Sequence, residues 1–247
     1  MSDGAHGTLA AGHHAARSTL AAADIGSRGL HHGAVAHRQW RDARVKPPSA
    51  PMLPQRADLV ALAYAVATAA AVGMYGFTPL SVGIPALLLV ALLADGIARP
   101  GSNLLYPTVT HGSRDGRCVA LSFDDGPDPE VTPLVLDTLA QYGARATFFT
   151  IGRSLQAQPL LARRMAAEHH EIGNHSWTHS RWQNFLGAHR QQREIARGAA
   201  AIAALNGREA QPLYRPPMGL KSPPMAQAAR RLQITVVAWS LHSRDTL

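Results

Sequence analysis

The stretch Leu121-Ser-Phe-Asp-Asp-Gly-Pro127 decides the fold of this chain. An apolar run from Cys118 to Phe123 has the composition of a buried strand, and the Gly-Pro pair after it is typical of a turn. Two adjacent carboxylates, Asp124 and Asp125, therefore stand where the predicted strand ends. Taken alone, they also have a structural interpretation, in which their side chains bond the backbone of the turn.

A pair of histidines spaced four residues apart follows in His175-Ser-Trp-Thr-His179. Aspartate and histidine suit a divalent metal such as zinc, and a metal with an open coordination position activates water. A chance pair in the core or on the surface is the simpler explanation for this motif alone, because the chain has 13 histidines. Arg215-Pro-Pro-Met-Gly219 follows at a third strand end, and together the three motifs favour a metal site.

These motifs, in this order, resemble the polysaccharide deacetylase family, also called the NodB-homology carbohydrate esterases. The resemblance implies an α/β fold, a distorted (β/α) barrel with fewer than eight complete units. It implies a metal-dependent hydrolase that removes N-acetyl or related N-acyl groups from an amino-sugar glycan or a lipid-linked amino sugar. Within that site it implies Asp124 as the catalytic base and Asp125, His175 and His179 as metal ligands.

The resemblance assigns further roles around the metal. Arg215 matches the arginine that orients the base, and the backbone N–H near Met218 matches a donor to the oxyanion. Asp245 resembles the aspartate that orients the family's catalytic histidine, and Ser176 is expected to brace the histidine loop. The expected cofactor is Zn²⁺, with Co²⁺, Ni²⁺ or Mn²⁺ as alternatives.

The last family motif, a Leu-x-His that carries the general acid, finds no match before Leu247, and His242 does not fit it. The stretch from Arg117 onward is also shorter than the roughly 200 residues that a closed barrel needs. We therefore expect an incomplete barrel, cut short at its C-terminus. A non-catalytic remnant or membrane-bound carbohydrate-binding pseudoenzyme is one alternative function, and a metal-dependent O-acetyl esterase is another.

Strands alternate with helices along this part of the chain, which predicts parallel strands joined by right-handed crossovers. Ser154 suits the N-cap of its helix. Cys118 is expected to be a small buried hydrophobe. His170 is expected to be solvated at a helix end or to interact with the C-terminus of that helix. The expected strands cover 117–123, 145–151, 171–174, 213–215 and 234–240, and the expected helices 132–142, 154–169, 188–205 and 224–232.

Composition divides the chain into four segments. Residues 1–57 form a basic, His- and Ala-rich tail that cannot bury a core, so we expect it to be disordered. Residues 58–96 hold an uncharged run that Gly76-Phe-Thr-Pro79 divides into two short transmembrane helices. Residues 97–116 are expected to be a linker and 117–247 the deacetylase domain. A buried helical hairpin of a soluble protein is the alternative for the apolar run.

Basic residues on both flanks of the apolar run predict its orientation. The positive-inside rule makes this a multi-pass protein of the inner (cytoplasmic) membrane with its catalytic domain facing the cytoplasm, which favours a lipid-linked amino sugar. Translation from Met52 would instead make the run a signal peptide or single anchor. The domain would then lie in the periplasm or outside the cell, where chitin-like or peptidoglycan-like polymers are the expected substrates. The flanking residues are Arg38, Arg41, Arg44, Lys46 and Arg56 before the run, and Arg99, Arg114 and Arg117 after it.

The charge and the cysteine count argue against a nucleic-acid-binding protein and against a disulfide-stabilised one. The net charge of +8 comes from scattered basic residues without interleaved aromatics, so we expect no nucleic-acid partner. Cys118 is the only cysteine and cannot form an intramolecular disulfide. Three aromatic residues, Trp177, Trp182 and Phe185, flank the histidine motif and suit either sugar stacking or core packing. The oligomeric state is unknown from the sequence.

Overall fold

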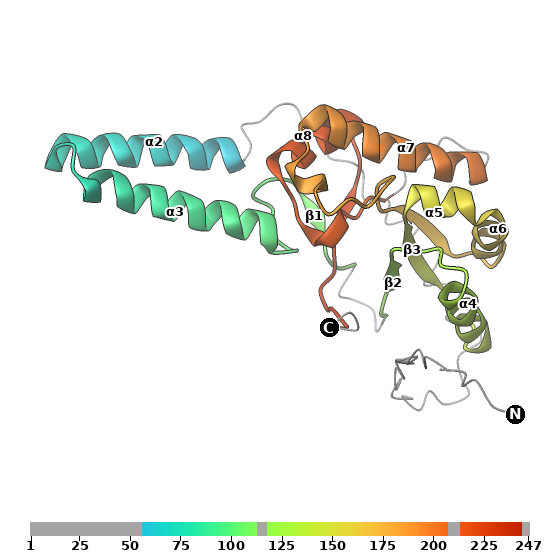
Figure 1. Ribbon diagram of the computed structural model, residues 1–247. Coiled ribbons are helices and arrows are strands. Elements are labelled where there is room, and N and C mark those ends of the chain that lie inside the picture. The colour runs from blue at the N-terminus through green and yellow to red at the C-terminus, as the bar shows by residue number, and fades with distance from the viewer. Residues whose placement is uncertain (1–55, 113–117, 207–212, 244–247) are drawn as a thin grey trace, which may run out of the picture.

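The computed structural model describes residues 56–112, 118–206 and 213–243, and the predicted tail up to residue 55 lies outside this part. Figure 1 shows a helical hairpin that projects from an α/β body. The hairpin consists of α2 (Arg56–Tyr75) and α3 (Pro79–Ala98). Gly76 turns the chain at φ 72°, a conformation that glycine adopts without strain. Thr78 and Ser81 then cap α3 by bonding each other's backbone N–H.

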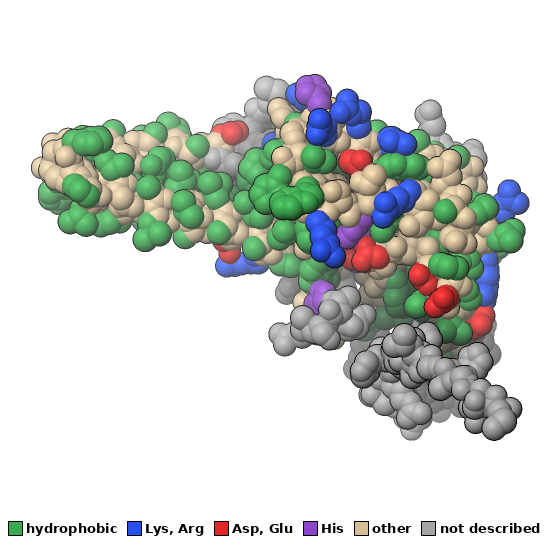
Figure 2. All heavy atoms as spheres, viewed as in Figure 1, with side chains coloured by type: hydrophobic (Ala, Val, Ile, Leu, Met, Phe, Trp, Pro, Cys, Tyr) green, Lys and Arg blue, Asp and Glu red, His purple; other side chains and the backbone are tan. Residues whose placement is uncertain are grey.

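The hairpin is long and apolar enough to cross a membrane, by length and composition. Nothing in Asp58–Tyr75 and only 11% of Pro79–Ala98 is buried within the described structure. Large apolar side chains such as Leu62 and Leu87 therefore face outward, and Figure 2 shows the hairpin surface covered by them. The two predicted helices are thus present.

Parallel strands build the body. Tyr214 joins two groups of strands through single bridges, one to Asn174 and one to Val236. The resulting order is β2-β3-β4-Tyr214-β5-β1, parallel throughout the described residues, as the alternation of strands and helices predicts. The strands are β1 (Thr108–Val109), β2 (Leu121–Asp124), β3 (Ala146–Thr150), β4 (Glu171–Asn174) and β5 (Val236–Val237).

The predicted helices are present within a few residues of their expected bounds, with one exception. The helix expected over 154–169 is two helices, because Pro159 has no N–H and Gln158 before it leaves the helical region at φ −122°. Ser154 consequently lies inside α5, whose N-cap is Ile151. The helices of the body are α4 (Val131–Gln141), α5 (Gly152–Ala157), α6 (Pro159–Ala167), η1 (Gln183–Phe185), α7 (Ala188–Asn206), η2 (Pro217–Gly219) and α8 (Pro223–Leu232).

The core has two apolar clusters. One fills the space between β3, β4 and the helices α4 and α6, with Phe148 and Met165 at its centre. The other surrounds Tyr214 and α8, and it includes residues that we expected to be linker. Leu105 and Tyr106 are each only 5% exposed there. The expectation of a linker over 97–116 is therefore wrong for its described residues, because this segment buries an apolar pair and then forms β1.

Two expectations about burial are also wrong. Cys118 is exposed, because β2 begins only at Leu121 and is an edge of the strand order, paired only with β3 among the described strands. His170 is buried at 8% exposure, with its ring edge-on to Phe148 at 5.3 Å between ring centroids. Both departures depend on neighbours from distant parts of the sequence.

Candidate metal centre

The predicted site residues gather at one edge of the parallel strands. Asp124 ends β2 and Asp125 follows it, while His175 follows the end of β4. Arg215 directly follows the Tyr214 bridge next to β4. The carboxyl ends of parallel strands share one edge, so residues nearly a hundred positions apart meet there.

Asp125, His175 and His179 form a compact set of donor atoms. Their ligand atoms all lie within 4.8 Å of one another. The Asp125 Oδ1 atom is 3.5 Å from His175 Nε2 and 3.2 Å from His179 Nε2. One carboxylate and two imidazoles leave a tetrahedral ion at least one position for water or substrate. The structure therefore brings the three predicted ligands together.

The buried histidine has the tautomer that a metal requires. His175 Nδ1 donates a hydrogen bond to the carbonyl oxygen of Arg215 at 2.7 Å, which leaves an unprotonated Nε2 facing Asp125. Burial lowers the pKa of His175, against the opposing charge of Asp124. A neutral imidazole with its lone pair directed at a carboxylate fits a divalent cation.

The loop between the two histidines is held by buried polar groups. Asn174 Oδ1 accepts a hydrogen bond from Ser176 N at 2.9 Å, and its Nδ2 donates to Ile195 O at 2.8 Å. Ser176 Oγ in turn accepts from His179 N at 3.0 Å, so Ser176 braces the loop as expected. A Cβ on Gly198 would lie 2.3 Å from Asn174 Oδ1, so α7 approaches this closely only with glycine there.

Two residues that hold this loop in place, Asn174 and Glu194, were not predicted from the sequence. Asn174 directly precedes the first histidine at the strand end, and that position could have indicated it. Glu194 lies on α7, and its Oε2 accepts hydrogen bonds from both N and Oγ1 of Thr178 at 2.8 Å. No local pattern links Glu194 to the loop, because the contact is made only when α7 packs beside β4.

Arg215 lies against the proposed base. Its Nη1 donates to Asp124 Oδ1 at 2.6 Å and to Ser122 Oγ at 3.0 Å. Its Nη2 donates to Ala238 O at 3.3 Å, and its guanidinium lies 4.0 Å from the centre of the Phe149 ring. Arg215 is only 4% exposed, so a buried guanidinium fixes the Oδ1 atom of Asp124.

The other predicted site residues have separate positions. Met218 lies in η2 at φ 57° and is 48% exposed, and its backbone N–H as an oxyanion donor stays a prediction. The loop is backed by Trp239, because a Cβ on Gly219 would lie 2.2 Å from that ring. Asp245 lies outside the described residues.

The aromatic residues around the histidine motif divide into two kinds. Trp177 is packed, with Arg197 4.4 Å above its ring and Gly152 against its edge. Trp182 and Phe185 are 71% and 81% exposed, and their ring centroids are 5.9 Å apart. Of the three rings, only those of Trp182 and Phe185 are largely exposed, while Trp177 is partly buried.

With the site defined, comparison with known families matches residues 111–237 to the polysaccharide deacetylase family. This match covers just over half of the chain and includes both carboxylates, both histidines and Arg215. The chain belongs to the polysaccharide deacetylase family.

Individual relatives agree with the family match. The chain is 37% identical over 126 residues to a peptidoglycan-N-acetylglucosamine deacetylase of Bacillus cereus. It is 41% identical over 142 residues to a chitooligosaccharide deacetylase of Rhizobium leguminosarum bv. phaseoli. These matches cover 51% and 55% of this chain, and 58% and 61% of the two relatives. The chain thus spans less than two thirds of the relatives' own length.

Solved structures show the same fold. A peptidoglycan N-acetylglucosamine deacetylase in complex with 4-naphthalen-1-yl-N-oxidanyl-benzamide matches at a TM-score of 0.50 and 32% identity, over 54% of this chain and 61% of that one. A mutant of a Bacillus anthracis CE4 family pseudoenzyme with restored enzymatic activity matches at 0.51 and 25% identity, over 56% and 50% of the two chains. The family therefore includes both active and inactive forms.

Proposed function

We propose that this protein is a metal-dependent carbohydrate N-deacetylase, which hydrolyses the N-acetyl or a related N-acyl amide of an amino sugar in a glycan or a lipid-linked sugar. The observation that carries this proposal is the cluster of Asp125, His175 and His179 beside the Asp124–Arg215 pair. The names of the Bacillus cereus and Rhizobium leguminosarum relatives support the substrate class.

The residues of the site have separate tasks in this reaction. Asp125, His175 and His179 would hold a divalent ion, Zn²⁺ by their chemistry or else Co²⁺, Ni²⁺ or Mn²⁺. When bound, such an ion would supply Lewis acidity toward the acyl carbonyl and would make water more acidic. The Asp124 carboxylate accepts one proton of the attacking water, and Arg215 fixes its direction through the 2.6 Å bond. As the C–N bond breaks, Asp124 returns this proton to the leaving nitrogen, so the products are the carboxylate and the free amine. The Met218 N–H donates to the oxygen on which negative charge develops.

Acetate release by the full chain in detergent micelles tests the proposal. We expect acetate from N-acetylated chitotetraose or from peptidoglycan fragments when Zn²⁺ is present. Asp124→Asn should lower the rate by about 10²- to 10⁴-fold, the usual loss for a general base. Asp137→Asn is the matched control, because Asp137 is an exposed carboxylate on α4, paired with Arg164 away from the site.

Metal content gives an independent readout. We expect elemental analysis to find one zinc per chain, and His179→Ala to lose it while keeping its circular dichroism. Equal metal in both proteins would contradict the ligand assignment. Saturable oligosaccharide binding without acetate release would instead indicate a carbohydrate-binding pseudoenzyme. Faster release from O-acetylated xylan would indicate an O-acetyl esterase.

We also propose that α2 and α3 cross the cytoplasmic membrane and leave the body on the cytoplasmic side. The support is the length, apolar composition and outward-facing surface of the hairpin, together with its basic flanks. In a Cys118→Ser background, Phe77→Cys at the turn should react with a membrane-impermeant thiol reagent in spheroplasts. Leu160→Cys on α6 should react only after lysis. Labelling of Leu160→Cys in intact spheroplasts would place the body outside the cytoplasm.

A further inference from the structure

Trp182 and Phe185 form a fixed, exposed aromatic pair on the segment that follows His179. Between them, Gln183 is only 1% exposed, and its Nε2 donates to Tyr214 Oη at 3.3 Å. Gln191 Nε2 donates back to the carbonyl oxygen of Gln183. The two rings are therefore held outward by a segment whose polar groups are anchored in the core. A large apolar surface that is exposed yet held in place indicates a binding surface.

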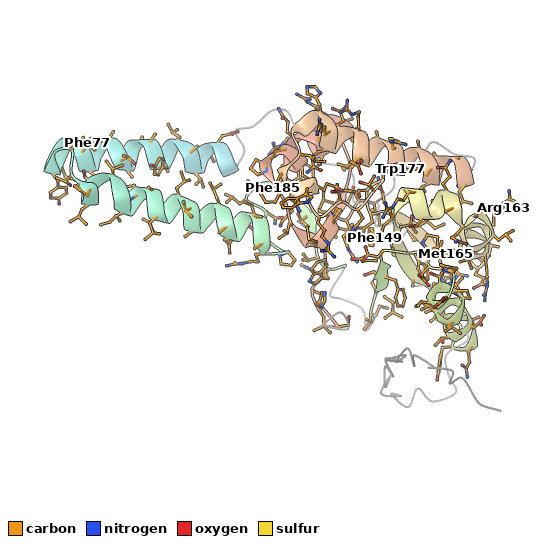
Figure 3. The ribbon with its side chains drawn as sticks, in the orientation of Figure 1. Phe77, Phe149, Arg163, Met165, Trp177 and Phe185 are labelled. Atoms are coloured by element: carbon orange, nitrogen blue, oxygen red, sulfur yellow. The ribbon has the colours of Figure 1, made fainter. Side chains whose placement is uncertain are left out.

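This aromatic pair lies near the base of the hairpin. Helix η1 contains Phe185, begins directly after Trp182 and packs against α8. Ile97 at the end of α3 packs against the apolar cluster that includes α8. At one end of α8, Lys221 N donates to Ile97 O of α3 at 3.1 Å. At its other end, burial lowers the pKa of Arg230, and the charge of Asp58 on α2 opposes that shift. Figure 3 accordingly shows Phe185 at the end of the body from which the hairpin leaves.

Lys221 holds the hairpin in a fixed relation to this surface. Its side chain is 1% exposed, and Nζ donates to the carbonyl oxygens of Arg99, Pro100 and Ser102 at 2.9, 3.0 and 2.6 Å. An ammonium group has three N–H donors, so all of them bind the turn that follows α3. The position of the aromatic pair along the hairpin axis is therefore fixed.

Basic side chains stand on both sides of the pair along the chain. Arg181 lies beside Trp182, and Arg190 and Arg193 lie on the first turns of α7; all three are exposed. None of the three forms a salt bridge to another described residue. Figure 2 shows basic side chains next to the apolar surface on this face of the body. Tryptophan and arginine together are typical of surfaces that contact lipid headgroups, where rings enter the interface and cations meet anionic lipids.

We propose that Trp182, Phe185 and Arg181 form a bilayer-contact surface that seats the metal-site loop at the lipid–water interface. The position of this surface near the base of the apolar hairpin, which Lys221 ties to the body, favours lipid over a sugar ring as its partner. Contact of this surface with the bilayer would bring His179, three residues before Trp182, close to substrates carried at the membrane surface. This inference rests on the proposed membrane crossing of the hairpin and is independent of deacetylation.

Site-specific fluorescence in vesicles tests the contact. The full chain, with Cys118→Ser, is reconstituted into vesicles of phosphatidylcholine and phosphatidylglycerol and labelled with the fluorophore NBD at single cysteines. Phe185→Cys reports the surface. Leu160→Cys is the matched control, because Leu160 is 77% exposed and Phe185 81%, on different parts of the body. Leu87→Cys, on α3, reports whether the hairpin is inserted. Lipids with a nitroxide near the headgroup or deep in the acyl chain serve as quenchers.

We expect shallow quenching at Phe185→Cys, deep quenching at Leu87→Cys and none at Leu160→Cys. Arg181→Gln should weaken the quenching at Phe185→Cys, most strongly in vesicles rich in phosphatidylglycerol. Equal, unquenched emission at Phe185→Cys and Leu160→Cys would overturn the proposal, as would an unquenched Leu87→Cys. An emission shift at Phe185→Cys with chitotetraose but not with lipid would assign the pair to sugar stacking. Because quenching requires no turnover, an inactive enzyme leaves this test decisive.

Discussion

The two sides of the site are built differently. On the β4 side, the His175 side chain is 3% exposed, and its loop is tied to α7 through Asn174 and Glu194. On the β2 side, the Asp125 side chain is 61% exposed and follows an edge strand. The His175 imidazole and the backbone of the histidine loop are thus held before any ion arrives, whereas the carboxylates depend on a few contacts for their position.

The histidine side of the site is therefore preorganised, whereas the carboxylate side is expected to become ordered when the metal binds. Buried hydrogen bonds hold the histidine loop at the cost of desolvated polar groups, so losing one of these bonds lowers stability directly. The carboxylate side has one strong internal partner, Arg215, which reaches across from the middle of the strand order. We expect substitutions on the β4 side to lower chiefly the stability of the protein. Substitutions on the β2 side are expected to change chiefly its activity and its metal dependence.

The largest expected effect comes from replacing Arg215, which connects the two sides of the site through its ion pair with Asp124. Arg215→Met should abolish acetate release and lower the free energy of unfolding by about 3 kcal/mol, because it leaves the half-buried Asp124 charge without its partner. Denaturant titration of the zinc-free protein measures this loss. The double variant with Asp124→Asn should regain part of the stability but none of the activity. Strictly additive losses would show that the pair is not coupled.

Metal removal should distinguish the two sides next. At a zinc concentration about 100 times its Kd, binding adds about 2.7 kcal/mol to stability by mass action. Hydrogen exchange with and without a chelator locates the change. We expect chelation to expose the amides of 121–126 and to leave those of 171–176 protected. Equal loss of protection on both strands would contradict a preformed histidine side.

A matched pair of truncations sharpens the contrast further. Asn174→Ala leaves the Ser176 N–H and the Ile195 carbonyl unpaired in the core, so we expect a loss of about 2 kcal/mol. Ser122→Ala removes one hydrogen bond of Arg215 on the exposed β2 side and should cost less than about 1 kcal/mol. Thermal denaturation compares the two variants. A larger loss for Ser122→Ala would reverse the proposed order.

The smallest expected effect is a pH dependence on the side of the body away from the ligands. Burial lowers the pKa of His170 below its ordinary 6.5, with Glu168 opposing this and Arg145 and Arg164 adding to it. The unfolded chain therefore binds a proton more readily, and stability is lost as the pH falls below about 6.5 toward the lower native pKa. His170→Gln should flatten this part of the stability profile. An unchanged profile would show that other groups, such as His175, cause it.

Much of the site was predictable because its residues stand next to strand ends. Asp124 and Asp125 come at the end of an apolar run, and His175 and His179 follow the short strand β4. Parallel strands bring such strand ends to one edge. The exposure of Cys118 and the placement of β1 were not predictable in this way. A two-residue strand has no periodicity, and burial at an edge depends on which strand lies beside it.

The sequence by itself determined the family motifs, their order, the division into two apolar helices at Gly76-Phe-Thr-Pro79 and the likeness of the site to a metal centre. These are local properties of composition and spacing. Only the tertiary structure decided which nitrogen of His175 faces Asp125, which aromatic rings stay exposed and how Lys221 fixes the hairpin to the body. Each of these depends on contacts between residues far apart in the chain, because the partner that satisfies a buried polar group is chosen by packing and not by sequence neighbours.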